Sequence, residues 1–270
     1  MAKAKPFGEL KPRRTGGAGV TPPGTRKQNL DRRFDQTQLR QSMHGTLVHR
    51  DYAAHFFRWG FASNFIAKDR STRILDVGCG QDLPLIRVII GNINALPSAY
   101  VGVDLNRLEK KYNIGWIESL YDEFSFVDRW KELKRTHAAF DLVTCFEVIE
   151  HMHEKDGYQL LAGVRNLMAP GATFLLSTPV YDGKKMAANH IHEYTVKELE
   201  STVKRAGFVI KQRFGTFASW NTLKKVITPE EKKLVETLNQ YYSHDVLSCF
   251  LAPKYPDASR NNTWVLERLR

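Results

Sequence analysis

Short apolar runs alternate along most of this chain with stretches that have a helical pattern of apolar positions. The apolar runs predict strands within residues 73–77, 99–106, 124–127, 140–148, 172–179, 208–214 and 263–269. Alternation of this kind is typical of an α/β protein in which helices flank a parallel sheet. A long segment separates the last two strands, so we expect them to form an antiparallel pair at one edge of the sheet.

Two helices outside this long segment have clear sequence signals. Thr195 and Glu198 have the spacing of a capping box, which predicts a helix beginning there. Residues 51–68 predict a helix that precedes the first strand. Most of its aromatic side chains are expected to pack on the sheet. Tyr52 and Arg58, on the same helix, are candidates for contacts with a substrate. His192, after the fifth predicted strand, is a further candidate.

Residues 215–262, between the last two strands, are too many for a hairpin. Within them, Thr228 followed by Pro229 indicates the start of a helix. The segment is expected to form either a lid over the substrate or a simple structural cover. If it is a lid, Tyr242 and Arg260 are candidates for lining the substrate site.

The composition is that of an ordinary protein domain, with 42% hydrophobic and 26% charged residues in 270 positions. The three cysteines, at positions 79, 145 and 249, fit neither a disulfide framework nor a zinc knuckle. They favour a reducing, cytoplasmic setting. We expect no role at a membrane, because the sequence has no apolar run of 18 residues and no signal peptide pattern.

The net charge of +11 is concentrated near the N-terminus, where residues 1–40 hold ten basic and three acidic residues, a local net charge of +7. Residues 1–28 are also rich in proline and glycine, which predicts a disordered basic tail ahead of one domain at 41–270. Such a tail can add affinity for a phosphate-rich partner such as a nucleic acid or nucleotide. Charge alone supports a solubilising role equally well.

The segment 74-ILDVGCG-80 leads from an apolar strand into two glycines. Glycine lets the backbone approach a ligand closely, because it has no side chain. Asp104 ends the second predicted strand, where a carboxylate can accept hydrogen bonds from both hydroxyls of a ribose. Together these features indicate a cofactor that contains a nucleoside.

The sequence resembles the class I S-adenosylmethionine-dependent methyltransferases. The matching segments are 74-ILDVGCG-80, 101-VGVDLN-106, 140-FDLVTCFEVIEHM-152 and 167-LMAPGATFLLSTP-179. The resemblance implies a three-layer, Rossmann-like fold with a seven-stranded, mostly parallel sheet and an antiparallel edge strand. It also implies S-adenosylmethionine as the cofactor, bound across the carboxyl ends of the first strands.

The resemblance further implies which residues surround the cofactor. They are Asp76, Gly78, Cys79, Gly80, Asp104, Leu105, Asp128 and Phe146. Asp76 and the two glycines would lie around the methionine part, and Asp104 would hold the ribose. Phe146 would line the sulfonium. Asp128 is placed near the adenine amino group because it follows the expected third strand.

Two other classes compete with this interpretation. A nicotinamide dehydrogenase would need the longer G-x-G-x-x-G pattern, but Leu83 occupies the position of the last glycine. A binding module that has the same fold and no activity stays open.

Glu147, Glu150 and His151 are the candidate catalytic residues. If a helix begins after the fourth strand, their side chains would project on one side of it. With His192 they would offer two carboxylates and two imidazoles to a divalent metal ion. This arrangement resembles the metal site of the small-RNA 3'-terminal 2'-O-methyltransferases. In small-molecule O-methyltransferases of this class, the histidine of a similar motif acts as a general base or contacts the substrate, so both alternatives stay open.

The acceptor of the methyl group is not defined by a motif. The chain has neither the Pro-Pro-Tyr type of signature nor the Pro-Cys pair of enzymes that methylate DNA bases. Its positive net charge favours an anionic acceptor, which can be a nucleotide, a nucleic acid or a small molecule.

Overall fold

The computed structural model of this protein describes residues 50–80, 83–91, 95–105, 115, 117–121, 126–184 and 186–269. The expected basic tail at residues 1–40 therefore lies outside the described residues. Among the helices described, none is both long and apolar enough to span a membrane.

The elements follow one another in an α/β order. The helices are α3 (Arg50–Ser63), α4 (Pro84–Ile90), α5 (Phe126–Thr136), α6 (Glu154–Leu167), α7 (Val196–Arg205), α8 (Trp220–Leu223), α9 (Pro229–Leu238) and α10 (His244–Leu251). The strands are β1 (Arg73–Val77), β2 (Ala99–Asp104), β3 (Ile117–Tyr121), β4 (Phe140–Phe146), β5 (Met168–Pro179), β6 (Phe208–Phe217) and β7 (Asn261–Arg268). Short 3-10 helices are η1 (Ile149–His151), η2 (Ala252–Lys254) and η3 (Pro256–Ala258).

These strands form one sheet in the order β3-β2-β1-β4-β5-β7-β6. Strands β1 to β5 pair in parallel, and β7 runs antiparallel to both of its neighbours. The predicted α/β, Rossmann-like and mostly parallel architecture is confirmed, as is the antiparallel pairing of the last two strands. The reversed strand itself, however, lies one place inside the edge, because β6 rather than β7 is outermost.

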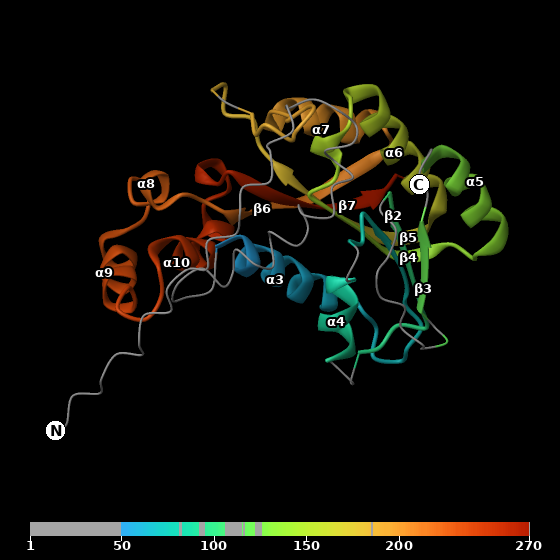
Figure 1. Cartoon of the computed structure of the whole chain (residues 1–270), viewed down its shortest axis with the longest axis horizontal. Coiled ribbons are helices and arrows are strands. Elements are labelled where there is room, and N and C mark those ends of the chain that lie inside the picture. Colours follow the sequence, from blue (N-terminus) through green and yellow to red (C-terminus); the bar gives the residue numbers. More distant parts are fainter. Residues whose placement is uncertain are drawn as a thin grey trace, which may run out of the picture.

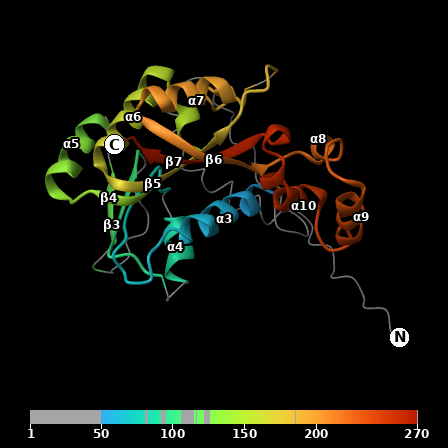
Figure 2. The same ribbon diagram turned by 180° about the vertical axis from the view of Figure 1, so that it is seen from behind.

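Helices cover both faces of the sheet (Figures 1 and 2), with α5, α6 and α7 on one face and α3 and α4 on the other. The alternation of side chains along β1 shows how the sequence produces these layers. Leu75 and Val77 belong to the core beneath α5–α7, whereas Ile74 belongs to the core beneath α3 and α4. Each of these three side chains is fully buried.

The prediction of the third strand was wrong. The strand β3 lies at Ile117–Tyr121, and residues 126–136 form α5 instead. A short apolar run does not distinguish a strand from the start of a helix. Trp130 and Leu133 of α5 are buried against the sheet, so the apolar residues of this region belong to an amphipathic helix. Asp128 therefore lies within α5, and the reason for placing it near adenine no longer holds.

A helical segment of residues 218–260 connects β6 with β7 and contains α8, α9 and α10. The capping box predicted at Thr195 and Glu198 is confirmed at the start of α7. The helix start predicted at Thr228 is confirmed at α9, where Thr228 and Glu231 also form a capping box. In both views of the molecule, α10 lies beside α3 at the β6 end of the sheet (Figures 1 and 2).

Candidate functional site

The turn after β1 contains the two glycines of the first motif, both with positive φ, 73° at Gly78 and 69° at Gly80. This left-handed backbone favours glycine. A Cβ atom on Gly78 would lie 2.1 Å from Cγ2 of Val148, which belongs to the loop after β4. At Gly78 both the backbone angle and the close packing therefore require glycine, and the β1 turn touches the loop that carries Glu147 and Glu150.

Asp104 lies at the end of β2, beside the β1 turn. Its Oδ2 accepts a hydrogen bond from the backbone N–H of Gly80 at 2.9 Å, and the residue is 7% exposed. Because neighbouring parallel strands end at the same edge of the sheet, this carboxylate and the glycine turn face one ligand position. Leu105 follows Asp104 and is half-buried.

Asp76 is anchored beneath the turn. Its two carboxylate oxygens accept hydrogen bonds from the hydroxyls of Tyr100, at 2.6 Å, and Thr144, at 2.7 Å. Burial raises the pKa of Asp76 to about 6, and the nearby Asp104 adds to this, although the two hydroxyl bonds act in the opposite direction. The polar groups of Asp76 thus tie β1 to β2 and β4.

Two further residues of the expected cofactor set are buried at the same edge. Cys79 lies within the turn with 2% of its surface exposed, and Phe146 ends β4 with 9% exposed. Their surroundings are apolar, since both belong to the core on the α3 and α4 side. The side chain of Asp128 lies outside the described residues.

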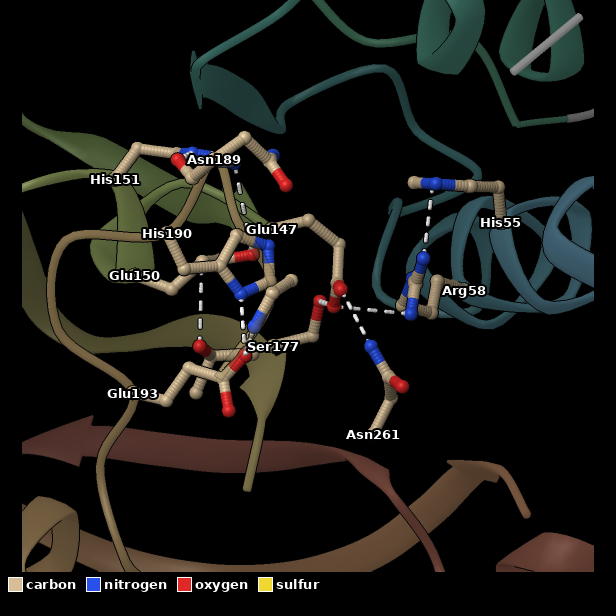
Figure 3. Close-up of polar contacts among 12 residues, drawn as sticks. His55, Arg58, Glu147, Glu150, His151, Ser177, Asn189, His190, Glu193 and Asn261 are labelled. Atoms are coloured by element: carbon tan, nitrogen blue, oxygen red, sulfur yellow. Dashed lines mark hydrogen bonds and ion pairs between the residues drawn. The ribbon is translucent and has the colours of Figure 1, made fainter. Parts of the chain in front are cut away.

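Glu147 holds a network of donors at the end of β4 (Figure 3). Its Oε1 accepts hydrogen bonds from Arg58, at 3.1 Å, and Ser177, at 2.9 Å, while its Oε2 accepts one from Asn261 at 2.5 Å. Its φ of 57° is left-handed, so Glu147 occupies a turn and does not begin the expected helix. A 3-10 helix, η1, follows at Ile149–His151.

Of the two candidate catalytic carboxylates, Glu147 and Glu150, Glu150 is the more buried, with 1% of its surface exposed. The hydroxyl of Thr178 donates to its Oε2 at 3.1 Å. Burial raises the pKa of Glu150 well above its ordinary value, and the neighbouring Glu147 raises it further. A carboxyl group in this position favours the protonated form unless a cation compensates its charge.

His151 presents one defined ring nitrogen to the site. Its Nδ1 lies 3.1 Å from the backbone oxygen of Asn189, and a carbonyl oxygen can only accept, so Nδ1 carries the hydrogen. The lone pair of the neutral ring is then on Nε2, which lies 3.9 Å from Oε1 of Glu150. Burial lowers the pKa of His151, and His190 lowers it further, so the neutral ring is favoured at neutral pH.

His190, rather than His192, completes the cluster. Ligand atoms of Glu150, His151 and His190 all lie within 4.8 Å of one another. Nδ1 of His190 is 2.5 Å from Glu193 (Figure 3). Glu193 also accepts a hydrogen bond from Arg260 at 2.5 Å.

His192 instead lies 2.9 Å from Glu198, so the structure does not bring it together with Glu150 and His151 as expected. In an extended chain, residues two apart would point to the same side. Here the N–H of His190 bonds to the oxygen of Ala187 and the chain bends at Ile191, so the two histidines do not share a side. The sequence indicated that the segment 189-NHIHEYT-195 brings a histidine to Glu150 and His151. It did not show whether that residue is His190 or His192.

The expected substrate contacts lie in three different settings. Arg58 is 2% exposed and donates hydrogen bonds to Glu147 and Thr216, so it holds the Glu147 carboxylate in place. Arg260 is engaged by Glu193 and by the backbone oxygen of Val180. Tyr242 is 46% exposed on the turn after α9, and the side chain of Tyr52 lies outside the described residues.

The fold and the glycine turn define a class of α/β proteins that bind a nucleoside cofactor at the carboxyl edge of a parallel sheet. Residues 49–213, more than half of the chain, match the protein family described as "Methyltransferase domain". The chain belongs to this family and is an S-adenosylmethionine-dependent methyltransferase of class I.

Solved structures show the same fold at low sequence identity. A SAM-dependent methyltransferase from Archaeoglobus fulgidus is 15% identical, with a TM-score of 0.55 over 88% of this chain and 100% of that one. The 1,6-didemethyltoxoflavin-N1-methyltransferase of Burkholderia thailandensis, with bound 1,6-didemethyltoxoflavin and S-adenosylhomocysteine, is 15% identical, with a TM-score of 0.52 over 94% and 93%. The [4+2]-cyclase SpnF is 14% identical, with a TM-score of 0.54 over 94% and 99%.

The cofactor is S-adenosylmethionine, and the residues at the β1 turn fit it. Gly78 and Gly80 give the turn a backbone without side chains, which lets a ligand approach closely, and Asp104 beside it offers a carboxylate for a pair of hydroxyls.

Proposed function

We propose that this enzyme transfers a methyl group to an anionic acceptor and that His151 removes the acceptor's proton. The observation that carries this proposal is the geometry of His151, whose Nδ1 is fixed by the carbonyl of Asn189 and whose Nε2 faces the cluster. A lowered pKa keeps this nitrogen unprotonated at neutral pH, as a general base requires.

The chain's contribution to methyl transfer is chiefly one of placement. When bound, the cofactor supplies a methyl group that is already electrophilic. Most of the rate acceleration therefore comes from aligning the acceptor with that group. Asp104 and the glycine turn hold the nucleoside side, and the Glu147 network fixes the loop that carries His151. Arg58 compensates the charge of Glu147, since their nearest atoms are 3.1 Å apart.

Two features support an anionic acceptor. The chain has a net charge of +11, and the basic residues 1–40 precede α3, which lies against the site. Both argue for a nucleotide, a nucleic acid or a small anionic molecule. In this proposal residues 215–262 act as the lid, because α10 lies beside α3 and Arg260 reaches the cluster through Glu193.

A metal-assisted reaction, such as 2'-O-methylation of RNA, is the second candidate. It is supported by Glu150, His151 and His190, whose ligand atoms lie within 4.8 Å of one another. In both histidines Nδ1 is held by an oxygen, which directs Nε2 toward a possible ion. Two imidazoles and a carboxylate suit a borderline divalent ion, and a cation would also compensate the buried charge of Glu150.

One set of variants separates these alternatives. Methyl transfer from labelled cofactor to pools of nucleotides, RNA and small acids is measured with and without a chelator. If His151 is a base, His151→Ala lowers the rate roughly 100- to 10,000-fold and the chelator has no effect. If a metal is required, the chelator abolishes transfer, and His190→Ala and Glu150→Gln are as damaging as His151→Ala.

His192→Ala is the matched control, because His192 bonds to Glu198 outside the cluster. It should leave the rate within a few-fold of that of the unaltered enzyme. Full activity of His151→Ala, with and without chelator, contradicts both mechanisms. Binding of S-adenosylhomocysteine without transfer to any acceptor pool would instead favour a binding module without activity.

A further inference from the structure

A cavity of about 330 Å³ lies between α3, β6 and α10, apart from the glycine turn and the histidine cluster. Its walls include Phe57, Phe61, Phe214, Thr216, Cys249 and Phe250. α3 and α10 lie side by side at this end of the sheet in both views of the molecule (Figures 1 and 2). The volume is at the lower end of the range found for small-molecule sites, about 300 to 1,000 Å³.

The walls of this cavity are suited to a flat ring. Phe61 and Phe214 meet edge to face with ring centroids 4.7 Å apart, and Phe57 and Phe250 do so at 4.8 Å. Phe214 and Cys249 form a buried floor, with 8% and 2% of their surfaces exposed, while Phe250 is 58% exposed. An exposed phenylalanine beside an apolar cavity gives an aromatic ligand a surface on which to stack.

Thr216 gives the cavity a polar group at its buried side. A guanidinium can only donate, so the Thr216 oxygen accepts the 3.3 Å hydrogen bond from Arg58. The O–H hydrogen of Thr216 can then donate to an acceptor atom of a ligand. The cavity thus favours an uncharged planar ring that carries a nitrogen or oxygen acceptor.

The cavity is adjacent to the Glu147 network. Thr216, on its wall, accepts a hydrogen bond from Arg58. Arg58 also donates to Glu147 (Figure 3). The next residue of β6, Phe217, pairs with Asn261, which donates to the other oxygen of Glu147. Hydrogen bonds through Thr216 and Arg58 therefore connect the wall of the cavity with Glu147, which precedes His151 in the loop after β4.

We propose that this cavity binds an uncharged planar ring of the methyl acceptor, such as a nucleobase or another heteroaromatic ring. The proposal rests on the proposed function and names the part of the acceptor that lies outside the reacting centre. The charged part of the acceptor stays in solvent or on the basic residues, while the ring stacks on Phe250 and receives a hydrogen bond from Thr216.

A neutral fluorescent probe tests the cavity without a known acceptor. N-phenyl-1-naphthylamine is titrated into the full chain saturated with S-adenosylhomocysteine, so that the cofactor site is filled. We expect saturable binding that Phe250→Ala weakens roughly ten-fold, in line with the loss of one stacking surface. Cys249→Phe, which fills the floor, should weaken it at least as much.

Leu234→Ala is the matched control, because Leu234 is exposed on α9 and does not line the cavity. It should bind the probe as the unaltered chain does. Unchanged S-adenosylhomocysteine affinity by calorimetry in every variant shows that each is folded. Equal probe affinity in Phe250→Ala, Cys249→Phe and the unaltered chain overturns the proposal.

Displacement identifies the source of the ring. Release of the probe by cytidine and guanosine assigns a nucleobase, and release by indole alone assigns a heteroaromatic ring without ribose. Release by none of them overturns the proposal.

In the labelled transfer assay, Phe250→Ala should raise the acceptor KM about ten-fold with little change in kcat. An unchanged KM would show that the cavity does not serve the acceptor. That result differs from a failure of the proposed chemistry, which appears as full activity of His151→Ala.

Discussion

The carboxylate of Asp104 should be the strongest single contact to the cofactor, because a charged acceptor of ribose hydroxyls contributes about 1.5 to 3 kcal/mol for each hydrogen bond. Asp104→Ala is therefore expected to weaken the binding of S-adenosylhomocysteine at least ten-fold in calorimetry. Asp182→Ala, on an exposed loop, is the control. An affinity that Asp104→Ala leaves unchanged would remove the ribose assignment.

Asp76 should make the stability of the protein depend on pH. Its folded-state pKa is raised from 3.8 to about 6, so the folded state binds more protons than the unfolded state between these values. The free energy of unfolding should therefore fall as pH rises from about 4 to about 6, by about 3 kcal/mol for a shift of about two units.

Urea unfolding of the cofactor-free protein at several pH values measures this effect. Asp76→Asn should lose most of the decrease, and Asp182→Asn should keep it. The same dependence on pH in Asp76→Asn as in the unaltered chain would assign the titration to other groups.

At the scale of residues, the sequence predicted the positions of the glycine turn and Asp104 better than the positions of the Glu147 and histidine side chains. Gly78, Gly80 and Asp104 are adjacent to strands whose apolar pattern is clear, so their positions followed from the strands. His190 lies in a loop, and Asn261 comes from a strand more than 100 residues away from Glu147. Contacts between such distant segments depend on how the strands are ordered, which local patterns do not encode.

At the scale of elements, the loop after β4 differed most from expectation. If a helix began after β4, it would carry Glu147, Glu150 and His151 on one side. Glu147 instead lies in a left-handed turn, and Glu150 and His151 lie in the 3-10 helix η1. The donors Arg58, Ser177 and Asn261 hold Glu147 in that turn, and all three come from other elements. Tertiary hydrogen bonds thus override the local helical spacing.

The capping box of α9 gives a prediction for the helical segment. Thr228 accepts a hydrogen bond from the backbone N–H of Glu231, so Thr228→Ala should lower the stability of α9 by about 1 kcal/mol. Native-state hydrogen exchange of the α9 amides measures this loss. Thr237→Ala, near the other end of the same helix, is the matched control and should have no comparable effect. Equal exchange in the two variants would argue against the cap.

At the scale of the whole molecule, we expect the basic N-terminal residues to increase the affinity of the enzyme for a polyanion. Deleting residues 1–28 should leave S-adenosylhomocysteine affinity unchanged, because the residues expected to bind the cofactor, such as Gly80 and Asp104, lie outside the deleted segment. It should weaken binding to single-stranded RNA and reduce the dependence of that binding on salt. Fluorescence anisotropy at several salt concentrations measures both. Equal RNA binding with and without these residues at low salt would make them a solubilising tail.

Strand β7 lies between β5 and β6 but follows both in sequence, after α8, α9 and α10. During synthesis on the ribosome, β5 and β6 therefore appear before the strand that joins them. Until β7 is made, each has an edge of unpaired backbone groups that can pair with another chain. Fully buried Trp264 and Leu266 can enter the core only at that last step. The newly made protein should therefore be most prone to aggregate while its helical segment is being synthesised.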